Sequence, residues 1–215
     1  MNMGQEYDSI NIIRKANAAM EIDYRPGLDF KTIGIAGKAG SGKDTAAEII
    51  KKLLWDHCGE AWDIDSFGKP ILQMFNAMMG IEPLNCPLPR NQKEQPHPAL
   101  SGMTPRKWMQ LAGTEFMRDM VAQNIWINLL QARNAYGTGV IIPDVRFDNE
   151  GEFCDVVIKI DRPTEADVEA HSSESGIDDL FIDLTVINDG SLEDFEREIR
   201  EAIGSLGYLG LEPSI

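Results

Sequence analysis

Residues 31–45 read KTIGIAGKAGSGKDT and determine the expected fold. The first half, Lys31 to Gly37, is a short β-type run that ends in glycine. Apolar residues at helical spacing follow and predict a helix from about Lys43 to Trp55. A strand, a glycine-rich turn and a helix in this order form the setting that a phosphate-binding loop requires.

The turn itself, Gly37–Asp44, matches the pattern GxxxxGK of phosphate-binding loops. Glycines let the backbone N–H groups point inward at an anion, beside the N-terminus of the next helix. We expect Lys43 to reach the β and γ phosphates of a nucleotide. The usual Ser or Thr after this lysine is replaced by Asp44, which precedes Thr45. Either Asp44 holds Mg²⁺, directly or through water, or Thr45 matters and Asp44 caps the helix.

Alternating elements follow the phosphate loop. Apolar runs predict short strands at residues 62–64, 140–144, 156–160 and 184–187. Helices are expected between these strands. Such alternation is typical of an α/β protein with a parallel sheet that is covered on both faces.

A proline-rich segment interrupts this alternation. Six of the eleven prolines lie between Pro83 and Pro105, so we expect a long functional loop and no regular element there. The segment ends at a predicted helix start, with Thr104 as the N-cap and Pro105 at the first helical position. Another helix start is predicted at Ser191, which is spaced to form a capping box with Asp194.

The composition excludes several classes of protein. Hydrophobic residues make up 43% and charged residues 26%, as in ordinary globular proteins. The net charge of −15 disfavours a broad nucleic-acid-binding face. The sequence has neither an apolar run near the roughly 20 residues that span a membrane nor the pattern of a secretory signal. Three scattered cysteines without CxxC spacing fit a reducing compartment, so we expect a cytoplasmic protein.

Other candidate site residues lie outside the phosphate loop. Asp144 ends an apolar run, where P-loop enzymes place a carboxylate beside the metal ion, and Pro143 must then lie at the very end of the strand. Trp126 follows a helix start at Asn124 and is a candidate for lining an acceptor pocket. Phosphoryl transfer also needs cations from several segments. The candidates are Lys93, Arg106, Arg118, Arg146 and Arg162.

One group of these residues has helical spacing. Arg106, Gln110 and either Glu115 or Arg118 are placed so that they can share one face of a helix. We therefore expect this face to point toward the site. Loops that leave the strand ends are where α/β sheets bind their ligands.

Taken together, the segments resemble the deoxynucleoside monophosphate kinases of bacteriophages, a branch of the P-loop nucleoside-monophosphate kinase group. GTE–R together with DVRF–NE is far more specific than the loop, and the GKD variant of the loop is usual in that family. Residues 68–69 (Gly-Lys) stand where the family more often has a small residue and Asp. The match runs from about Ile33 to Phe195 through IGIAGKAGSGKDTAA, DSFGKPI, QKE, TPRKWMQLAGTEFMRD, NIWINLL, VIIPDVRFDNE, IDRP, HSSE and VINDGSLEDF.

The resemblance implies a P-loop NTPase fold, a three-layer α/β sandwich with a parallel sheet and nucleoside-monophosphate-kinase-like insertions. We expect an N-terminal helical extension at residues 1–30 and the kinase domain at 31–215. Within that domain, the acceptor-binding region is expected at about 66–135. A lid over ATP is expected at about 161–180, including the HSSE segment with Glu174.

The resemblance also implies roles for individual residues. Catalysis is expected to use Lys43, Arg118, Arg146 and Asp144, and the metal ligands to be Asp44 and Asp144. The acceptor is expected to bind Lys69, Lys93, Arg106, Gln110, Glu115 and Trp126. ATP is expected to bind Gly37, Lys38, Ala39, Gly40, Ser41, Gly42, Lys43, Asp44, Thr45 and Arg162.

The expected reaction is ATP + dNMP → ADP + dNDP with Mg²⁺. Two alternatives stay open: a P-loop kinase for another phosphorylated acceptor, such as phosphomevalonate or dephospho-coenzyme A, and a non-catalytic regulatory protein that binds ATP. The expected partners are ATP and a dNMP, without nucleic acid or membrane. The resemblance suggests a homodimer and, for a bacteriophage protein, the host cytoplasm.

Overall fold

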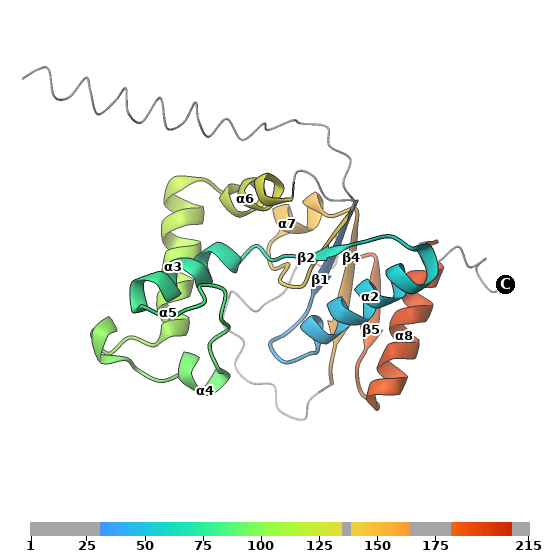
Figure 1. The fold of residues 1–215 in the computed structure, drawn as a ribbon, viewed down its shortest axis with the longest axis horizontal. Coiled ribbons are helices and arrows are strands. Elements are labelled where there is room, and N and C mark those ends of the chain that lie inside the picture. The colour runs from blue at the N-terminus through green and yellow to red at the C-terminus, as the bar shows by residue number, and fades with distance from the viewer. Residues whose placement is uncertain (1–30, 135–138, 164–181, 208–215) are drawn as a thin grey trace, which may run out of the picture.

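The computed structural model describes residues 31–134, 139–163 and 182–207 (Figure 1). The predicted N-terminal extension and most of the predicted lid, including Glu174, lie outside the described residues. The described strands form one parallel sheet in the order β2-β3-β1-β4-β5. The strands are β1 (Lys31–Ala36), β2 (Asp63–Ile64), β3 (Gly139–Ile142), β4 (Val156–Asp161) and β5 (Leu184–Ile187).

These strands confirm the parallel α/β fold that the sequence predicts. β1 is central, with Ile33 opposite Ile141 of β3 and Val156 of β4. β3 ends at Ile142, so Pro143 lies just beyond it, where its missing N–H costs no ladder hydrogen bond. Asp144 therefore stands in the loop that leaves the carboxyl end of β3.

Helical segments connect and cover the strands (Figure 1). Their labels follow that figure. They are α2 (Lys43–Cys58), α3 (Lys69–Met79), α4 (Arg90–Lys93), the 3₁₀-helix η1 (Pro98–Leu100), α5 (Pro105–Gln110), the π-helix η2 (Leu111–Val121), α6 (Ile125–Arg133), α7 (Asp148–Phe153) and α8 (Leu192–Ser205).

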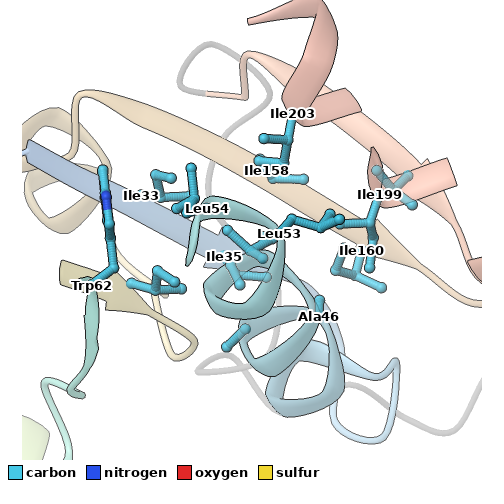
Figure 2. Packing of buried hydrophobic residues seen from close by; sticks show 14 of the residues in the cluster. Ile33, Ile35, Ala46, Leu53, Leu54, Trp62, Ile158, Ile160, Ile199 and Ile203 are labelled. Carbon is cyan, nitrogen blue, oxygen red and sulfur yellow. The ribbon is translucent and has the colours of Figure 1, made fainter. Parts of the chain in front are cut away.

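Both faces of the sheet carry a hydrophobic core. Figure 2 shows the face on which Ile33 and Ile35 of β1 meet Leu53 and Leu54 of α2. Residues of α8 complete this layer. On the opposite face, residues of β3 such as Val140 pack with α6. Burial of each large apolar side chain contributes about 1.5–3 kcal/mol, so the alternating strand residues hold a helix layer on each side. The three-layer sandwich is confirmed.

Local capping patterns correctly predict two helix starts. Thr104 Oγ1 accepts a hydrogen bond from Lys107 N at 3.1 Å, and Pro105 is the first residue of α5. At the start of α8, Asp194 N donates to Ser191 Oγ and Ser191 N donates to Asp194 Oδ2, both at 3.2 Å. These side chains satisfy N–H groups that the first turn leaves without helical partners.

The proline-rich segment differs in part from the expectation. It contains two short helices, α4 and η1, although most of it is irregular. The buried side chain of Asn76 in α3 anchors the beginning of this segment. Its Nδ2 donates to Leu84 O at 2.8 Å and to Cys86 O at 2.9 Å. Anchored in this way, the loop passes beside the carboxyl ends of the strands.

The helix after Thr104 also winds differently from the α-helix that the sequence predicts. It starts as α5 and continues as η2, whose hydrogen bonds reach five residues back, as from Ala122 N to Met117 O at 3.0 Å. A π-helix turns by a smaller angle per residue than an α-helix. Residues beyond Gln110 therefore leave the face that a period of 3.6 assigns to them.

Candidate functional site

Two glycines of the phosphate loop between β1 and α2 stand where a side chain would not fit. Gly37 has φ 146°, and a Cβ there would lie 2.4 Å from Ile160 O. Gly42 has φ 106°, and a Cβ there would lie 2.6 Å from Asn188 Nδ2. Larger residues at either position would combine an unfavourable backbone conformation with a steric clash. The glycines are thus required by the shape of the loop.

The lysine of the loop lies against the loop backbone. Lys43 Nζ donates to Gly37 O at 2.7 Å and to Lys38 O at 2.8 Å. Its ammonium is therefore held beside the N–H groups that form the anion site. Ser41 Oγ is buried and has no hydrogen-bond partner among the described residues. A loop of this shape, with an ammonium and an unused hydroxyl, fits a polyphosphate.

Asn188 holds the phosphate loop from the neighbouring end of β5, since the carboxyl ends of β1 and β5 lie at the same edge of the parallel sheet. Its Nδ2 donates to Ser41 O at 2.7 Å, and its backbone N donates to Asp161 O at 2.7 Å. The residue follows β5 directly, so the sheet register fixes its position. We did not select it from the sequence, although the motif VINDG contains it. We regard it as a residue that positions the phosphate loop.

A cavity of about 720 Å³ lies next to the loop, within the size range of small-molecule sites. Asp44, at the start of α2, lines it from the side of the phosphate loop. The segments after β2 and β3 also line it, as do the proline-rich segment and α5. The carboxyl ends of parallel strands are the usual ligand site of an open α/β sheet.

Many predicted site residues meet in this cavity. Arg106 is paired with Glu94, and Lys69 Nζ lies 3.1 Å from Asp65 Oδ1. Burial and then the neighbouring Arg106 guanidinium lower the pKa of Lys93. The predicted residues that line the cavity are Asp44, Lys69, Lys93, Arg106, Gln110, Trp126, Asp144 and Arg146.

Outside the phosphate loop, three of the predicted site residues do not line the cavity. Glu115 is exposed on η2 and does not line the cavity. Arg162 is exposed at the end of β4. Arg118 does not line the cavity but packs on Phe147, which does. Its guanidinium carbon lies 3.7 Å from the centre of the Phe147 ring. Its Nη2 donates to Asn149 Oδ1 at 2.8 Å.

Asp144 joins the loops that follow β3 and β2. Its carboxylate accepts hydrogen bonds from Phe67 N at 2.9 Å and from Gly68 N at 2.8 Å. Burial raises the pKa of Asp144, because it disfavours the charged form. A Cβ at Gly68 would lie only 3.1 Å from Asp144 Oδ2. Glycine at position 68 avoids this close approach.

A second buried acid, Glu150, was not selected from the sequence. Its side chain accepts from Arg146 N at 2.8 Å and from Phe147 N at 3.2 Å, and only 3% of the residue is exposed. Burial and then the charge of Asp144 raise the pKa of Glu150 to about 7. A glutamate at the third position of a predicted helix was the available signal. That signal predicts that the glutamate caps the helix, but it does not predict that its side chain is buried.

The described residues offer few protein ligands for a metal ion. No group of three or more His, Cys, Asp or Glu side chains within them is arranged to hold one. Asp44 and Asp144 both line the cavity. Mg²⁺ commonly takes one or two carboxylates and completes its shell with phosphate oxygens and water. The residues therefore fit a metal that is bound together with a nucleotide.

Searched for membrane spans, the described part of the chain has no helix of sufficient length and apolar character to cross a bilayer.

Solved structures of kinases resemble this fold at low sequence identity. Dephospho-CoA kinase from Campylobacter jejuni is 15% identical with a TM-score of 0.40, and the match covers 84% of this chain and 98% of the other. Shikimate kinase from Acinetobacter baumannii in complex with shikimate is 15% identical with a TM-score of 0.41, covering 83% and 96%.

Sequence comparison provides the stronger evidence. The family model for deoxynucleotide monophosphate kinase matches residues 92–199. A putative deoxynucleotide monophosphate kinase of Acanthamoeba polyphaga mimivirus is 31% identical over 196 residues, covering 82% of this chain and 98% of the relative. The deoxynucleoside-5'-monophosphate kinase of Escherichia phage T5 is 25% identical over 225 aligned residues, covering 73% and 88%. With this site and these relatives, the chain belongs to the deoxynucleotide monophosphate kinase family.

Proposed function

We propose that this chain transfers the γ-phosphoryl group of ATP to a deoxynucleoside monophosphate. The observation that carries the proposal is a cavity beside the phosphate loop that is lined by Lys93, Arg106 and Arg146. Most of its lining comes from the acceptor region that we propose, residues 66–135. Membership of the family supplies the class of acceptor.

On the donor side, the phosphate loop would hold ATP. Its backbone N–H groups would bind the phosphates, and Lys43 would exchange its two backbone acceptors for phosphate oxygens. Bound Mg²⁺ would neutralise part of the phosphate charge. We propose Asp44 as its nearest protein ligand. Because Asp144 already accepts two backbone hydrogen bonds, we propose that it acts on the metal shell through its remaining lone pairs.

On the acceptor side, the cavity offers both charge and apolar surface. Phe67, Ile71 and Trp126 line it together with the cations, so the base and sugar would lie against apolar side chains. The monophosphate would then be bound by Arg106 and Arg146. Guanidinium groups suit this role because they present paired donors to phosphate oxygens.

The reaction needs little covalent help from the protein. An oxygen of the acceptor phosphate attacks the γ phosphorus of ATP, and the bond from that phosphorus to the β–γ bridging oxygen breaks. ADP leaves with this electron pair, and the product is a deoxynucleoside diphosphate. The phosphate oxygen is already a nucleophile, so no general base is required. The acceleration comes from alignment of the two reactants and from neutralisation of the phosphate charge.

A coupled assay of ADP release tests this proposal directly. ATP and Mg²⁺ are supplied with each deoxynucleoside and ribonucleoside monophosphate in turn, and with phosphomevalonate and dephospho-coenzyme A. Turnover with a dNMP, lost when EDTA is added, is the expected result. If ATP stabilises the chain but no dNMP is phosphorylated, the proposed acceptor is wrong and the ATP site stands.

We also propose a homodimer and a cytoplasmic location, both suggested by the sequence resemblance. Light scattering after size-exclusion chromatography tests the first. A mass of one chain, about 23.9 kDa, at micromolar concentration would refute it.

A further inference from the structure

The short helix α4 begins close to the phosphate loop. Pro89 precedes it, and Pro89 O accepts hydrogen bonds from Gln92 N at 3.0 Å and from Lys93 N at 3.1 Å. These contacts fix the turn that carries Arg90 and Lys93. Residues three positions apart are neighbours on a helix surface, so the two cations project from one small unit.

Arg90 lies against the phosphate loop. Its Nη1 is 3.5 Å from the point where a Cβ on Gly40 would stand, so the guanidinium lies beside this part of the loop. Gly40 belongs to the GxxxxGK turn and has φ 81°. A guanidinium from the proline-rich segment is therefore next to the backbone that forms the donor-phosphate site.

Unlike Arg106, Lys69 and Arg133, the Arg90 side chain has no carboxylate partner among the described residues. Arg106 is paired with Glu94, and Asp65 neutralises Lys69 and Arg133. Arg90 makes no hydrogen bond or ion pair within residues 31–134, 139–163 and 182–207. The chain has 35 acidic residues against 20 Lys and Arg, so an unneutralised arginine at the loop is notable. A polyanion is the ligand that it fits best.

Lys93 connects the same helix to the acceptor cavity. Its side chain lines that cavity, and the charges of Arg106, Asp44 and Arg146 act on it. α4 thus places Arg90 at the donor loop and Lys93 in the acceptor cavity. Cations from one rigid turn would approach both reactants of a phosphoryl transfer.

We propose that Arg90 binds the β and γ phosphates of ATP together with Lys43. This role rests on the proposed kinase function, because it assigns ATP to the loop. Arg90 would donate to phosphate oxygens of the bound nucleotide while Lys93 contacts the acceptor. The proline-rich segment would then contact both the bound ATP and the acceptor, which gives this long segment a function.

Direct titration of ATP binding tests the role of Arg90 without any acceptor. The variants are Arg90→Gln, which removes the charge, and Arg90→Lys, which keeps it but lacks the paired donors. Arg200→Gln is the matched control, since Arg200 is an exposed arginine on α8 whose guanidinium contacts His57. Thermal unfolding without nucleotide verifies the fold of each variant.

Loss of charge-assisted hydrogen bonds is expected to weaken ATP binding about 10- to 100-fold in Arg90→Gln, and less in Arg90→Lys. Binding of a dNMP alone should not change in either variant, and Arg200→Gln should bind ATP like the unmodified chain. ATP affinity of Arg90→Gln within twofold of the unmodified chain would overturn the proposal, as would an equal loss in Arg200→Gln. Since no turnover is measured, these results stand even if dNMPs are not phosphorylated.

Discussion

Replacing Glu150 with glutamine is expected to change how the stability of the chain depends on pH. Burial, followed by the nearby Asp144 charge, raises the pKa of Glu150 from 4.5 to about 7 in the folded chain. Between these values the folded state holds a proton that the unfolded state has lost. Stability from this group is therefore fully present below pH 4.5 and is lost as the pH rises through 7.

The size of the effect follows from the pKa difference. A shift from 4.5 to about 7 corresponds to about 3 kcal/mol, most of which is lost between pH 5 and pH 8. Glutamine keeps an oxygen that can accept from Arg146 N and Phe147 N, so the hydrogen bonds can survive while the charge is removed. The variant should thus be more stable than the unmodified chain at pH 8 by about 2–3 kcal/mol.

Urea unfolding at pH 5, 6, 7 and 8 measures this difference, in EDTA and without nucleotide. Glu152→Gln is the matched control, because Glu152 is exposed on the same helix α7. Its free energy of unfolding should differ from that of the unmodified chain by the same small amount at every pH. A Glu150→Gln effect that does not grow with pH would refute the burial argument, as would a variant that is less stable at pH 8.

Other substitutions are expected to change either the activity or the free energy of unfolding, but not both. Lys43→Ala should lower dNMP-dependent ADP release at least about 10²–10³-fold with an unchanged melting temperature, because it removes a preorganised phosphate donor; activity near normal would refute its role. Asn188→Ala removes the hydrogen bond to Ser41 O and should raise the KM for ATP more than that for the dNMP, as measured by separate titrations in the coupled assay. Thr32→Val breaks contacts with Asp155 Oδ2 and should cost about 1–3 kcal/mol in urea unfolding with both KM values unchanged.

Local features of the fold could be predicted from the sequence because their partners lie close together along the chain. The GxxxxGK turn and the Ser191–Asp194 box involve residues three to seven positions apart. The strands at residues 156–160 and 184–187 are marked by apolar runs and agree with β4 and β5 within one residue. Periodicity and capping chemistry are sufficient for such elements.

The candidate site was harder to predict because it depends on contacts between distant segments. Glu115 and Arg118 lie on the π-helix η2, whose smaller turn per residue cannot be read from helical spacing in the sequence. The raised pKa of Glu150 depends on its burial and on Asp144, so sequence could indicate only a cap. Arg90 was overlooked because nothing in a proline-rich stretch shows which loop it will contact.

The hydrogen bond from Asn188 to Ser41 also has a consequence for synthesis of the chain. Its two residues are 147 positions apart, and β4 connects the strands that precede them, because it pairs with both β1 and β5. At about 5–20 residues per second, a ribosome needs roughly 7–30 s to travel this distance. The phosphate loop therefore emerges from the ribosome well before the residue that braces it. A nascent chain therefore gains its nucleotide-binding shape late, after almost the whole sheet exists.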